Sequence, residues 1–254
     1  MLPEERQELI THEIKKSKYC SIVDLSTRLN VSTATIRRDL QALSASNVIR
    51  LTRGGAAYVF ANTVQEPAYT VKSALHLEEK ERIGLAACRL VKPGETILLD
   101  TGTTVFQMTP GLREIQNLMV ATNDVLIASE LASCANVSLC VLGGLVRKGY
   151  YTTTGFWTQQ ALESMHVDRF FLSCDAVDIS GGCSITNSEE ILVKQLMLNA
   201  CNECYLLADH TKFESVAFIR VCGVERLRGI ITGRELSQKT RQEYEAMGVQ
   251  MILV

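Results

Sequence analysis

The chain has 254 residues, of which 46% are hydrophobic and 21% are charged, and its formal net charge is −2. This composition supports a sizeable core and excludes an intrinsically disordered chain. No apolar run approaches the roughly 18 residues of a membrane span, and the acidic start MLPEERQELI is unlike a signal peptide. We therefore expect a cytoplasmic protein with no membrane partner.

The nine cysteines are scattered through apolar segments, so we expect reduced thiols packed as small hydrophobic side chains. Cys201 and Cys204 form one CxxC pair. A structural zinc ion needs four ligands, and no second pair or close histidine pair completes the set. Inert packing is also the simpler reading of Cys174. We expect no metal ion and no cofactor.

The charge is unevenly distributed along the chain. Residues 1–58 carry nine Lys and Arg against six Asp and Glu, whereas the remainder carries 17 against 22. A modest positive charge on a short N-terminal module suits contact with DNA phosphates, although a solvated helix face often carries as much.

The first 45 residues predict three helices. Arg6, Ile10 and Ile14 recur at four-residue spacing with Leu9 beside them, which indicates a first helix of about three turns. Ser21 is a candidate N-cap of a second helix that ends at Leu29, whose inward residues are predicted to be Val23, Leu25 and Leu29. Asn30–Val31 makes a turn, and Ser32 is a candidate N-cap of a third helix, TATIRRDLQAL, buried through Ile36, Leu40 and Leu43. This arrangement predicts a helix-turn-helix.

The third helix carries the chemistry of a DNA reader near its N-terminus. Hydroxyls and backbone N–H groups there can bond phosphate oxygens, and an arginine can contact guanine in the major groove with about 1–3 kcal/mol of discrimination. Asp39 is expected to orient a neighbouring arginine. The segment NVIRLTRGGAAYV that follows predicts a glycine-turned β-hairpin, or wing. The candidate DNA-binding residues are Ser32, Thr33, Thr35, Arg37, Arg38, Arg50 and Arg53. An ordinary three-helix bundle with solvated arginines is the alternative.

These residues resemble the signature of the DeoR-type, glycerol-3-phosphate-repressor-like transcriptional regulators. The resemblance lies in Arg6-x3-Ile10-x3-Ile14 and, after 17 residues, in Ser32-x2-Thr35-Ile36-Arg37-Arg38-Asp39-Leu40. The wing tip Arg53-Gly54-Gly55-Ala56 is also similar, although that family often has His in place of Arg53.

We expect residues 1–58 to be the DNA-binding domain, 59–77 a linker and 78–254 an effector-sensing and oligomerisation domain. A helix from about Glu79 to Val91 ends before Pro93–Gly94. Short apolar runs then alternate with helical stretches: TILL, LMVA, VSLCVL, RFFLSC, CYLLA, RGIIT and VQMILV. Strands of this kind are buried on both faces, which predicts an α/β domain with a mainly parallel sheet.

Ligands of open parallel sheets bind beyond the carboxyl ends of the strands. Polar residues follow five of the predicted strands, and the loop Asp100–Thr104 could cradle a phosphate where a helix begins. Taken singly, each of these polar residues is weak evidence for a ligand site. Such loops also cap helices, and Glu190–Lys194 could be a surface i, i+4 pair. The candidate effector-binding residues are Asp100, Gly102, Thr103, Thr104, Asn123, Gly143, Gly144, Arg147, Asp175, Glu190, Lys194 and Lys212.

The segments LLDTGTT, ATND, LGGLVR, FFLSCDAVD, EEILVK and LLADHTKF also resemble the effector domain of the same regulators. The resemblance implies a fold similar to ribose-5-phosphate isomerase and a sugar phosphate or related metabolite as inducer. One departure is that Ser173, Cys174 and Ala176 stand where relatives commonly have glycines. The pocket is expected to be altered there.

Together these features and the resemblance predict a transcriptional regulator, a repressor of a carbohydrate-utilisation operon that a phosphorylated sugar or related metabolite releases from operator DNA. A homo-oligomer, dimer or tetramer, is expected because one winged helix offers too little base contact for tight specific binding. An activator is an open alternative. An isomerase using Asp175 and Asp178 is a weaker one, because Ile179–Gly182 stands where the isomerase has Lys-Gly-Gly-Gly. We expect no enzymatic activity.

Overall fold

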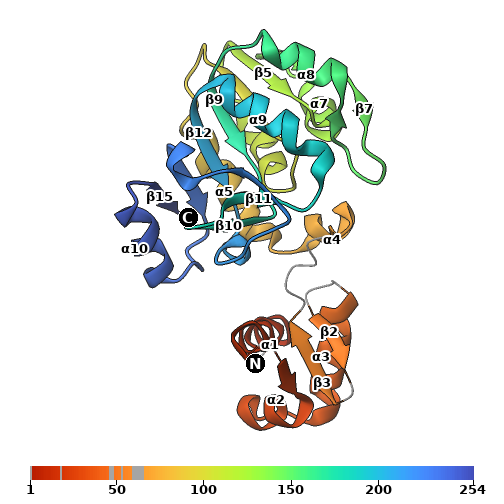
Figure 1. The fold of residues 1–254 in the computed structure, drawn as a ribbon. Coiled ribbons are helices and arrows are strands. Elements are labelled where there is room, and N and C mark those ends of the chain that lie inside the picture. Colours follow the sequence, from red (N-terminus) through yellow and green to blue (C-terminus); the bar gives the residue numbers. More distant parts are fainter. Residues whose placement is uncertain (1, 18, 46–48, 53, 59–65) are drawn as a thin grey trace. The chain divides into compact units, whose positions relative to one another are not determined.

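The computed structural model describes residues 2–17, 19–45, 49–52, 54–58 and 66–254. The chain divides into two compact units, Met1–Pro67 and Ala68–Val254, which we call unit 1 and unit 2. Figure 1 shows the elements of both units. None of the helices in the described ranges is both long enough and apolar enough to cross a membrane.

Unit 1 is a helix-turn-helix with a small antiparallel sheet. Its described helices are α1 (Pro3–Ser17), α2 (Ile22–Leu29) and α3 (Thr33–Ala45). Its described strands, in the order β1-β3-β2, are β1 (Tyr19–Ser21), β3 (Gly55–Tyr58) and β2 (Ile49–Thr52). The predicted helices and hairpin are confirmed, and β1 is an addition that the sequence did not indicate.

The helix caps of unit 1 follow the sequence, whereas one apolar assignment was wrong. Ser21 accepts a hydrogen bond from the backbone N–H of Asp24, as predicted for an N-cap. Val23 was expected to face inward, but its side chain is 65% exposed. The reason is the helical period: Ile22, Leu25 and Leu29 share the face that packs in the core, and Val23 lies off that face. Leu9 is likewise exposed rather than part of the buried stripe.

Unit 2 is built on a seven-stranded parallel sheet in the order β15-β14-β12-β9-β4-β5-β6. The predicted α/β fold with a mainly parallel sheet is therefore confirmed. In chain order the strands are β4 (Thr96–Leu99), β5 (Leu118–Thr122), β6 (Val137–Val141), β9 (Val167–Leu172), β12 (Cys201–Leu207), β14 (Gly229–Thr232) and β15 (Gln250–Leu253).

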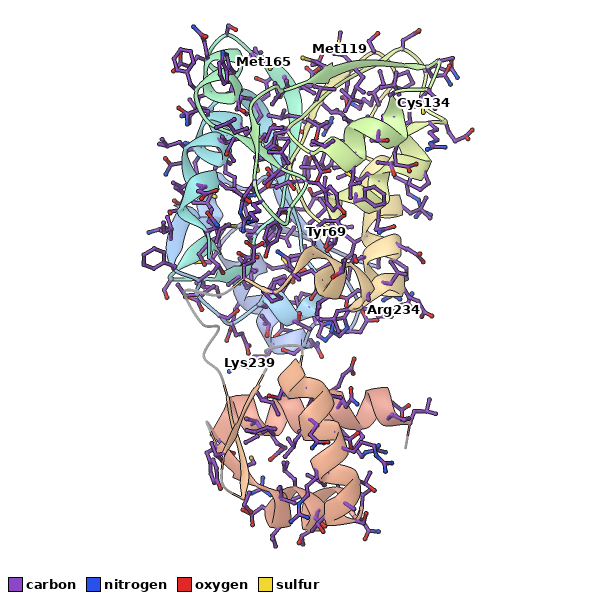
Figure 2. The ribbon with its side chains drawn as sticks, turned by 90° about the vertical axis from the view of Figure 1, so that its right-hand side faces the viewer. Tyr69, Met119, Cys134, Met165, Arg234 and Lys239 are labelled. Carbon is purple, nitrogen blue, oxygen red and sulfur yellow. The ribbon has the colours of Figure 1, made fainter. Side chains whose placement is uncertain are left out.

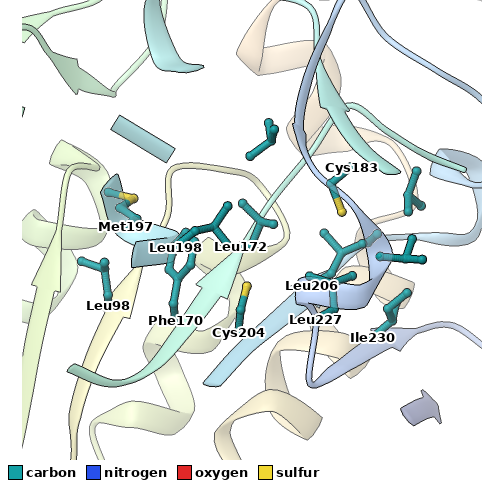
Figure 3. Close-up of a cluster of buried hydrophobic side chains, with 14 of the residues drawn as sticks. Leu98, Phe170, Leu172, Cys183, Met197, Leu198, Cys204, Leu206, Leu227 and Ile230 are labelled. Atoms are coloured by element: carbon teal, nitrogen blue, oxygen red, sulfur yellow. The ribbon is translucent and has the colours of Figure 1, made fainter. Parts of the chain in front are cut away.

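Helices cover both faces of this sheet, which explains its continuously apolar strands. Ile97 and Leu99 of β4 face a core shared with α5 (Leu77–Cys88), α6 (Thr109–Leu112) and α7 (Val125–Leu131). Leu98 faces the opposite core, shared with α8 (Phe156–Glu163), α9 (Ile191–Asn199) and α10 (Gln238–Ala246). Figure 3 shows this second core, in which Cys183 and Cys204 pack among leucines.

Several smaller elements of unit 2 were not indicated by the sequence. Two short antiparallel sheets pair β7 (Leu145–Val146) with β8 (Thr153–Thr154), and β10 (Ala176–Asp178) with β11 (Gly182–Ile185) and β13 (Ile219–Cys222). Single 3₁₀ turns are η1 (Val105–Met108), η2 (Ser188–Glu190), η3 (His210–Lys212) and η4 (Val224–Arg226). The segment expected as a linker, 59–77, contains the helix α4 (Tyr69–Ala74), which belongs to unit 2.

Candidate functional site

Five of the seven candidate DNA-binding residues lie around the start of α3. Ser32, Thr33, Arg37 and Arg38 are exposed, and Thr35 is half-buried with its hydroxyl 2.9 Å from the Ser32 hydroxyl. Neither arginine forms an ion pair with any other residue that the structure describes. Arg50 lies on β2, where its side chain is not described, and Arg53 lies outside the described residues.

Asp39 fixes the orientation of α3 from the buried side. Its carboxylate accepts two hydrogen bonds from Arg6 of α1, at 2.6 Å from Nε and 3.2 Å from Nη2. Such a bidentate pair is geometrically specific. Asp39 therefore holds Arg6 rather than one of the exposed arginines of α3, and the pair links the two helices that present this surface.

The predicted effector residues gather at one edge of the unit 2 sheet. Asp100, Asn123, Gly143, Asp175 and Lys212 follow β4, β5, β6, β9 and β12. These five strands are immediate neighbours in the parallel order β12-β9-β4-β5-β6. Since carboxyl ends of parallel strands meet at one edge, the five tips share that edge. We call this group the strand-end site.

A buried chain of charges runs through the strand-end site. Arg147 Nη1 lies 2.5 Å from Glu190 Oε1, Glu190 Oε2 lies 3.8 Å from Lys194 Nζ, and Lys194 Nζ lies 2.5 Å from Asp100 Oδ2. Asp100 and Lys194 are almost fully buried, with side-chain exposures of 0% and 2%. Burial disfavours the charged ammonium, but Asp100 and Glu190 outweigh it and raise the pKa of Lys194. Glu190–Lys194 is therefore not a surface pair.

Asp100 also connects β4 to the neighbouring strand end. Its Oδ2 accepts a hydrogen bond from the backbone N–H of Ser173 at 2.9 Å. Gly102 packs against the same residue, and a Cβ at Gly102 would lie 2.7 Å from Ser173 Oγ. Only glycine allows this approach. Ser173, which stands where the regulators that this chain resembles commonly have a glycine, thus contacts both Asp100 and Gly102.

Thr103 and Thr104 form the loop that was expected to cradle a phosphate. Both are buried, and within the described residues no acceptor contacts their backbone N–H groups or their hydroxyls. The loop is followed by η1 and α6, which are single turns. Any anion here would be held by amides and hydroxyls rather than by a long helix dipole.

Asn123 is held at the end of β5 and keeps one acceptor unused. Its Nδ2 donates to Thr152 Oγ1 at 2.9 Å and to the Thr153 carbonyl at 3.3 Å. Its Oδ1 is buried and has no hydrogen-bond partner among the described residues. A buried, unsatisfied amide oxygen is unfavourable, so a ligand hydroxyl would be accommodated there.

Gly143 and Gly144, which follow β6, pack against α8 rather than joining the buried chain of charges. The Gly143 carbonyl accepts a hydrogen bond from Thr158 Oγ1 at 2.7 Å, and Gly144 lies so close to the same threonine that a Cβ would collide. These contacts join the strand end to α8. Among the described residues they bring neither glycine into contact with Lys194 or Asp175.

Sequence reasoning missed Lys72, which contacts the strand-end site from α4. Its Nζ lies 3.0 Å from Asp175 Oδ1, and both side chains are about one-fifth exposed. Burial acts to raise the pKa of Asp175, but the charges of Lys72 and Lys212 outweigh it and hold that pKa well below its usual value. No sequence signal pointed to Lys72, because residues 57–77 show no period.

Two further contacts hold α4 over this edge. Lys80 Nζ donates to the carbonyl oxygens of Lys72 and, at 2.6 Å, of Leu75. Burial lowers the pKa of Lys80 to about 8, partly offset by Asp209. The Tyr69 ring, labelled in Figure 2, packs edge-on against Tyr151 at 4.9 Å between centroids. Both ends of α4 are thus anchored within unit 2.

Asp124 is a second residue that was missed, and here a signal existed. It directly precedes the apolar run of α7 and caps that helix through the N–H groups of Leu126 and Ile127. Its other oxygen accepts a hydrogen bond from Thr101 Oγ1 at 2.8 Å. An Asp before an apolar helix is an N-cap signature. Asp124 therefore holds the 100–104 loop next to β5.

Comparison with known proteins places both units in named families. Residues 6–61 match the model of the DeoR-like helix-turn-helix domain, and residues 75–234 match that of the DeoR C terminal sensor domain. A putative aga operon transcriptional repressor of Escherichia coli O157:H7 is 30% identical over 98% of this chain and 93% of its own length. The HTH-type transcriptional regulator GolR of Listeria innocua is 29% identical over 98% of each chain.

Solved structures similar to this chain include the ribose 5-phosphate isomerase A of Methanocaldococcus jannaschii. It shares 18% identity at a TM-score of 0.39, over 53% of this chain and 53% of that chain. A ribose 5-phosphate isomerase from Plasmodium falciparum gives 12% identity and a TM-score of 0.39, over 54% and 52%. Likenesses of this level say nothing about enzymatic activity.

Proposed function

Because this chain belongs to the DeoR family of DNA-binding transcriptional regulators, we propose that it represses a carbohydrate-utilisation operon and that a phosphorylated sugar releases it. The observation that carries the proposal is the Lys72–Asp175 ion pair, which ties α4 to the strand-end site. Unit 1 ends at Pro67 and α4 begins at Tyr69. A ligand that alters this pair acts on the first helix after the DNA-binding unit.

The charges of the strand-end site suit a phosphate ester. Four cations lie among four carboxylates: Lys72, Arg147, Lys194 and Lys212 against Asp100, Asp175, Glu190 and Asp209. Lys212 is half-buried and forms no ion pair within the described ranges. Together with the amides of Thr103 and Thr104, it offers donors for phosphate oxygens.

The sugar hydroxyls would have their own partners. The unsatisfied Asn123 Oδ1 can accept one hydroxyl, and the Asp175 carboxylate can accept another. A phosphate near Lys72 would compete with Asp175 for the ammonium, since both are anions. The ligand then favours a form in which the Lys72–Asp175 contact differs, and this differential affinity shifts the population of DNA-binding forms.

A melting-temperature screen of the full chain against sugar phosphates and the matching unphosphorylated sugars tests the ligand class. A phosphorylated sugar should raise the melting temperature because it binds the native state. Thr103→Val should abolish this shift while leaving operator affinity near normal. Equal shifts with the unphosphorylated sugars would contradict the proposal, as would a normal shift in Thr103→Val.

Lys72→Met tests the coupling itself. We expect this variant to bind operator DNA but to respond weakly to the sugar phosphate, since α4 no longer carries the exchangeable cation. Lys239→Met is the matched control, because Lys239 is 83% exposed and, among the residues that the structure describes, pairs only with Glu243 on the same helix. An assay with a reporter gene distinguishes repression from activation, because the strand-end site can serve either mode of regulation.

The named relatives are transcriptional regulators, and an isomerase role has no support from them. Incubating the full chain with pentose and hexose phosphates would reveal turnover if Asp175 acted as a proton acceptor. We expect none.

A further inference from the structure

Residues 141–160 of unit 2, which include the β7–β8 hairpin and the start of α8, expose almost no charged side chain. Of their ten exposed positions, only Lys148 carries a charged side chain. Five of the ten carry large apolar or aromatic side chains on the β7–β8 hairpin and at the start of α8, and we call them the hairpin patch: Leu145, Val146, Tyr151, Phe156 and Trp157. Depletion of charge with enrichment of aromatic residues is typical of the centre of a protein interface.

The members of the hairpin patch lie on adjoining backbone. Leu145 pairs across the hairpin with Thr154, two residues before Phe156. The Gly143 carbonyl accepts a hydrogen bond from Thr158 of α8, and Phe156 packs edge-on against Trp157 at 6.4 Å between ring centroids. Figure 1 shows β7 and α8 at the same end of unit 2. The patch therefore spans two adjoining elements, the β7–β8 hairpin and the start of α8.

The hairpin patch supplies a large part of the surface that a stable interface between proteins buries. Leu145, Phe156 and Trp157 are 69%, 66% and 62% exposed. With Val146 and Tyr151, these side chains present roughly 500 Å² of apolar surface, which lies at the upper end for a single patch on a monomer. A stable interface buries about 800 Å² per partner. The surrounding backbone and polar side chains can supply the difference.

We infer that the hairpin patch is the contact surface between two copies of this chain. Each copy carries one recognition helix, α3, and helix-turn-helix regulators bind two half-sites as symmetric dimers. In a two-fold interface the same patch faces itself. A patch of one charge sign would repel itself, whereas this one has a single lysine at its margin.

The same hairpin connects the patch to the strand-end site, so the dimer, resting on the proposed function, would be linked to the effector. Leu145 and Val146 face outward, whereas Arg147, the next residue, is buried against Glu190. Tyr151 of the patch touches Tyr69 of α4. A ligand that displaces the Arg147–Glu190 pair or the Tyr69–Tyr151 contact therefore displaces part of the interface.

Sedimentation of the full chain over a wide concentration range tests the inference, with Leu145→Glu and Phe156→Glu as disrupting variants. Each should weaken self-association at least tenfold, because it places a desolvated carboxylate within the apolar contact surface of each copy. Phe218→Glu is the matched control, since Phe218 is also 61% exposed but lies beside β13. It should leave the dimer unchanged.

Trp157 is the chain's one tryptophan, so its emission reports on the patch directly. The emission should shift to longer wavelength when the dimer is diluted or when Leu145→Glu is introduced. A monomer at all concentrations would overturn the inference. So would a dimer that survives both patch variants, or one in which Trp157 emits as a solvated side chain.

The sugar-phosphate shift in melting temperature, measured on the same variants, separates this inference from the proposed function. A monomeric Phe156→Glu that still gains stability with the ligand confirms that it is folded and isolates the interface as the defect. A wild-type dimer whose melting temperature no sugar phosphate raises would instead contradict the proposed ligand class. It would not contradict the proposed interface.

Discussion

Replacing Lys194 by Met removes the cation at the centre of the strand-end site. Its ammonium lies 2.5 Å from Asp100 Oδ2, 3.3 Å from the Ser173 carbonyl and 3.8 Å from Glu190 Oε2. Glu190 keeps Arg147 as a partner, but Asp100, which is 0% exposed, loses its only cation among the described residues. The variant therefore leaves a buried carboxylate without a counter-charge.

Breaking a buried pair in this way costs about 3–5 kcal/mol, because the remaining charge stays desolvated. For a unit of this size, each kcal/mol lowers the melting temperature by about 2–4 °C, so we expect a fall of roughly 6–20 °C. Urea unfolding followed by circular dichroism gives the free energy of unfolding. Lys239→Met, at an exposed site, should change it by less than about 0.5 kcal/mol.

The double variant Lys194→Met with Asp100→Asn separates the charge effect from lost packing. Removing the orphaned carboxylate should restore part of the stability, so the two changes should be strongly non-additive. If Lys194→Met alone cost less than about 1 kcal/mol, or if the double variant were simply additive, the buried network would not hold this edge together.

Three further predictions concern single residues. Gly102→Ala should abolish sugar-phosphate stabilisation in the melting assay, because its Cβ would meet Ser173 Oγ at 2.7 Å; an unchanged ligand shift would exclude the packing account. Asp39→Ala should lower the free energy of unfolding by about 1–3 kcal/mol through loss of the bidentate Arg6 contact, and a neutral result in urea unfolding would contradict it. Burial raises the pKa of Asp209, but Lys212 and the Thr211 hydroxyl outweigh it and bring it to about 2. This depressed carboxyl pKa contributes about 2 kcal/mol of stability above about pH 4, which is lost as the pH falls through about 2; Asp209→Asn should flatten that part of the stability curve.

The sequence predicted the elements whose signal is local. The spacing of Ile10 and Ile14, the caps Ser21 and Ser32, and the seven apolar runs correspond to helices and strands of the structure. The proximity of the polar residues that follow neighbouring strands could also be predicted, because the carboxyl ends of parallel strands lie at one edge of the sheet. These features depend on periodicity within about ten residues.

The remainder depends on contacts between distant segments. Lys72 reaches Asp175 across 103 positions of sequence, and nothing in its own neighbourhood indicates a site. Val23 was misplaced because an apolar side chain in a short helix does not reveal which face meets the core. The β7–β8 hairpin was missed because Leu145–Val146 and Thr153–Thr154 are too short to show alternation.

Operator binding by the full chain, measured by fluorescence anisotropy on DNA from its own promoter region at low salt, tests the central claim most directly. We predict tight binding that a sugar phosphate relieves, and at least tenfold weaker binding by Arg37→Ala, whose exposed guanidinium lies on α3. Protein that does not bind this DNA either with or without sugar phosphates would contradict the account. So would protein that binds it equally well in both conditions.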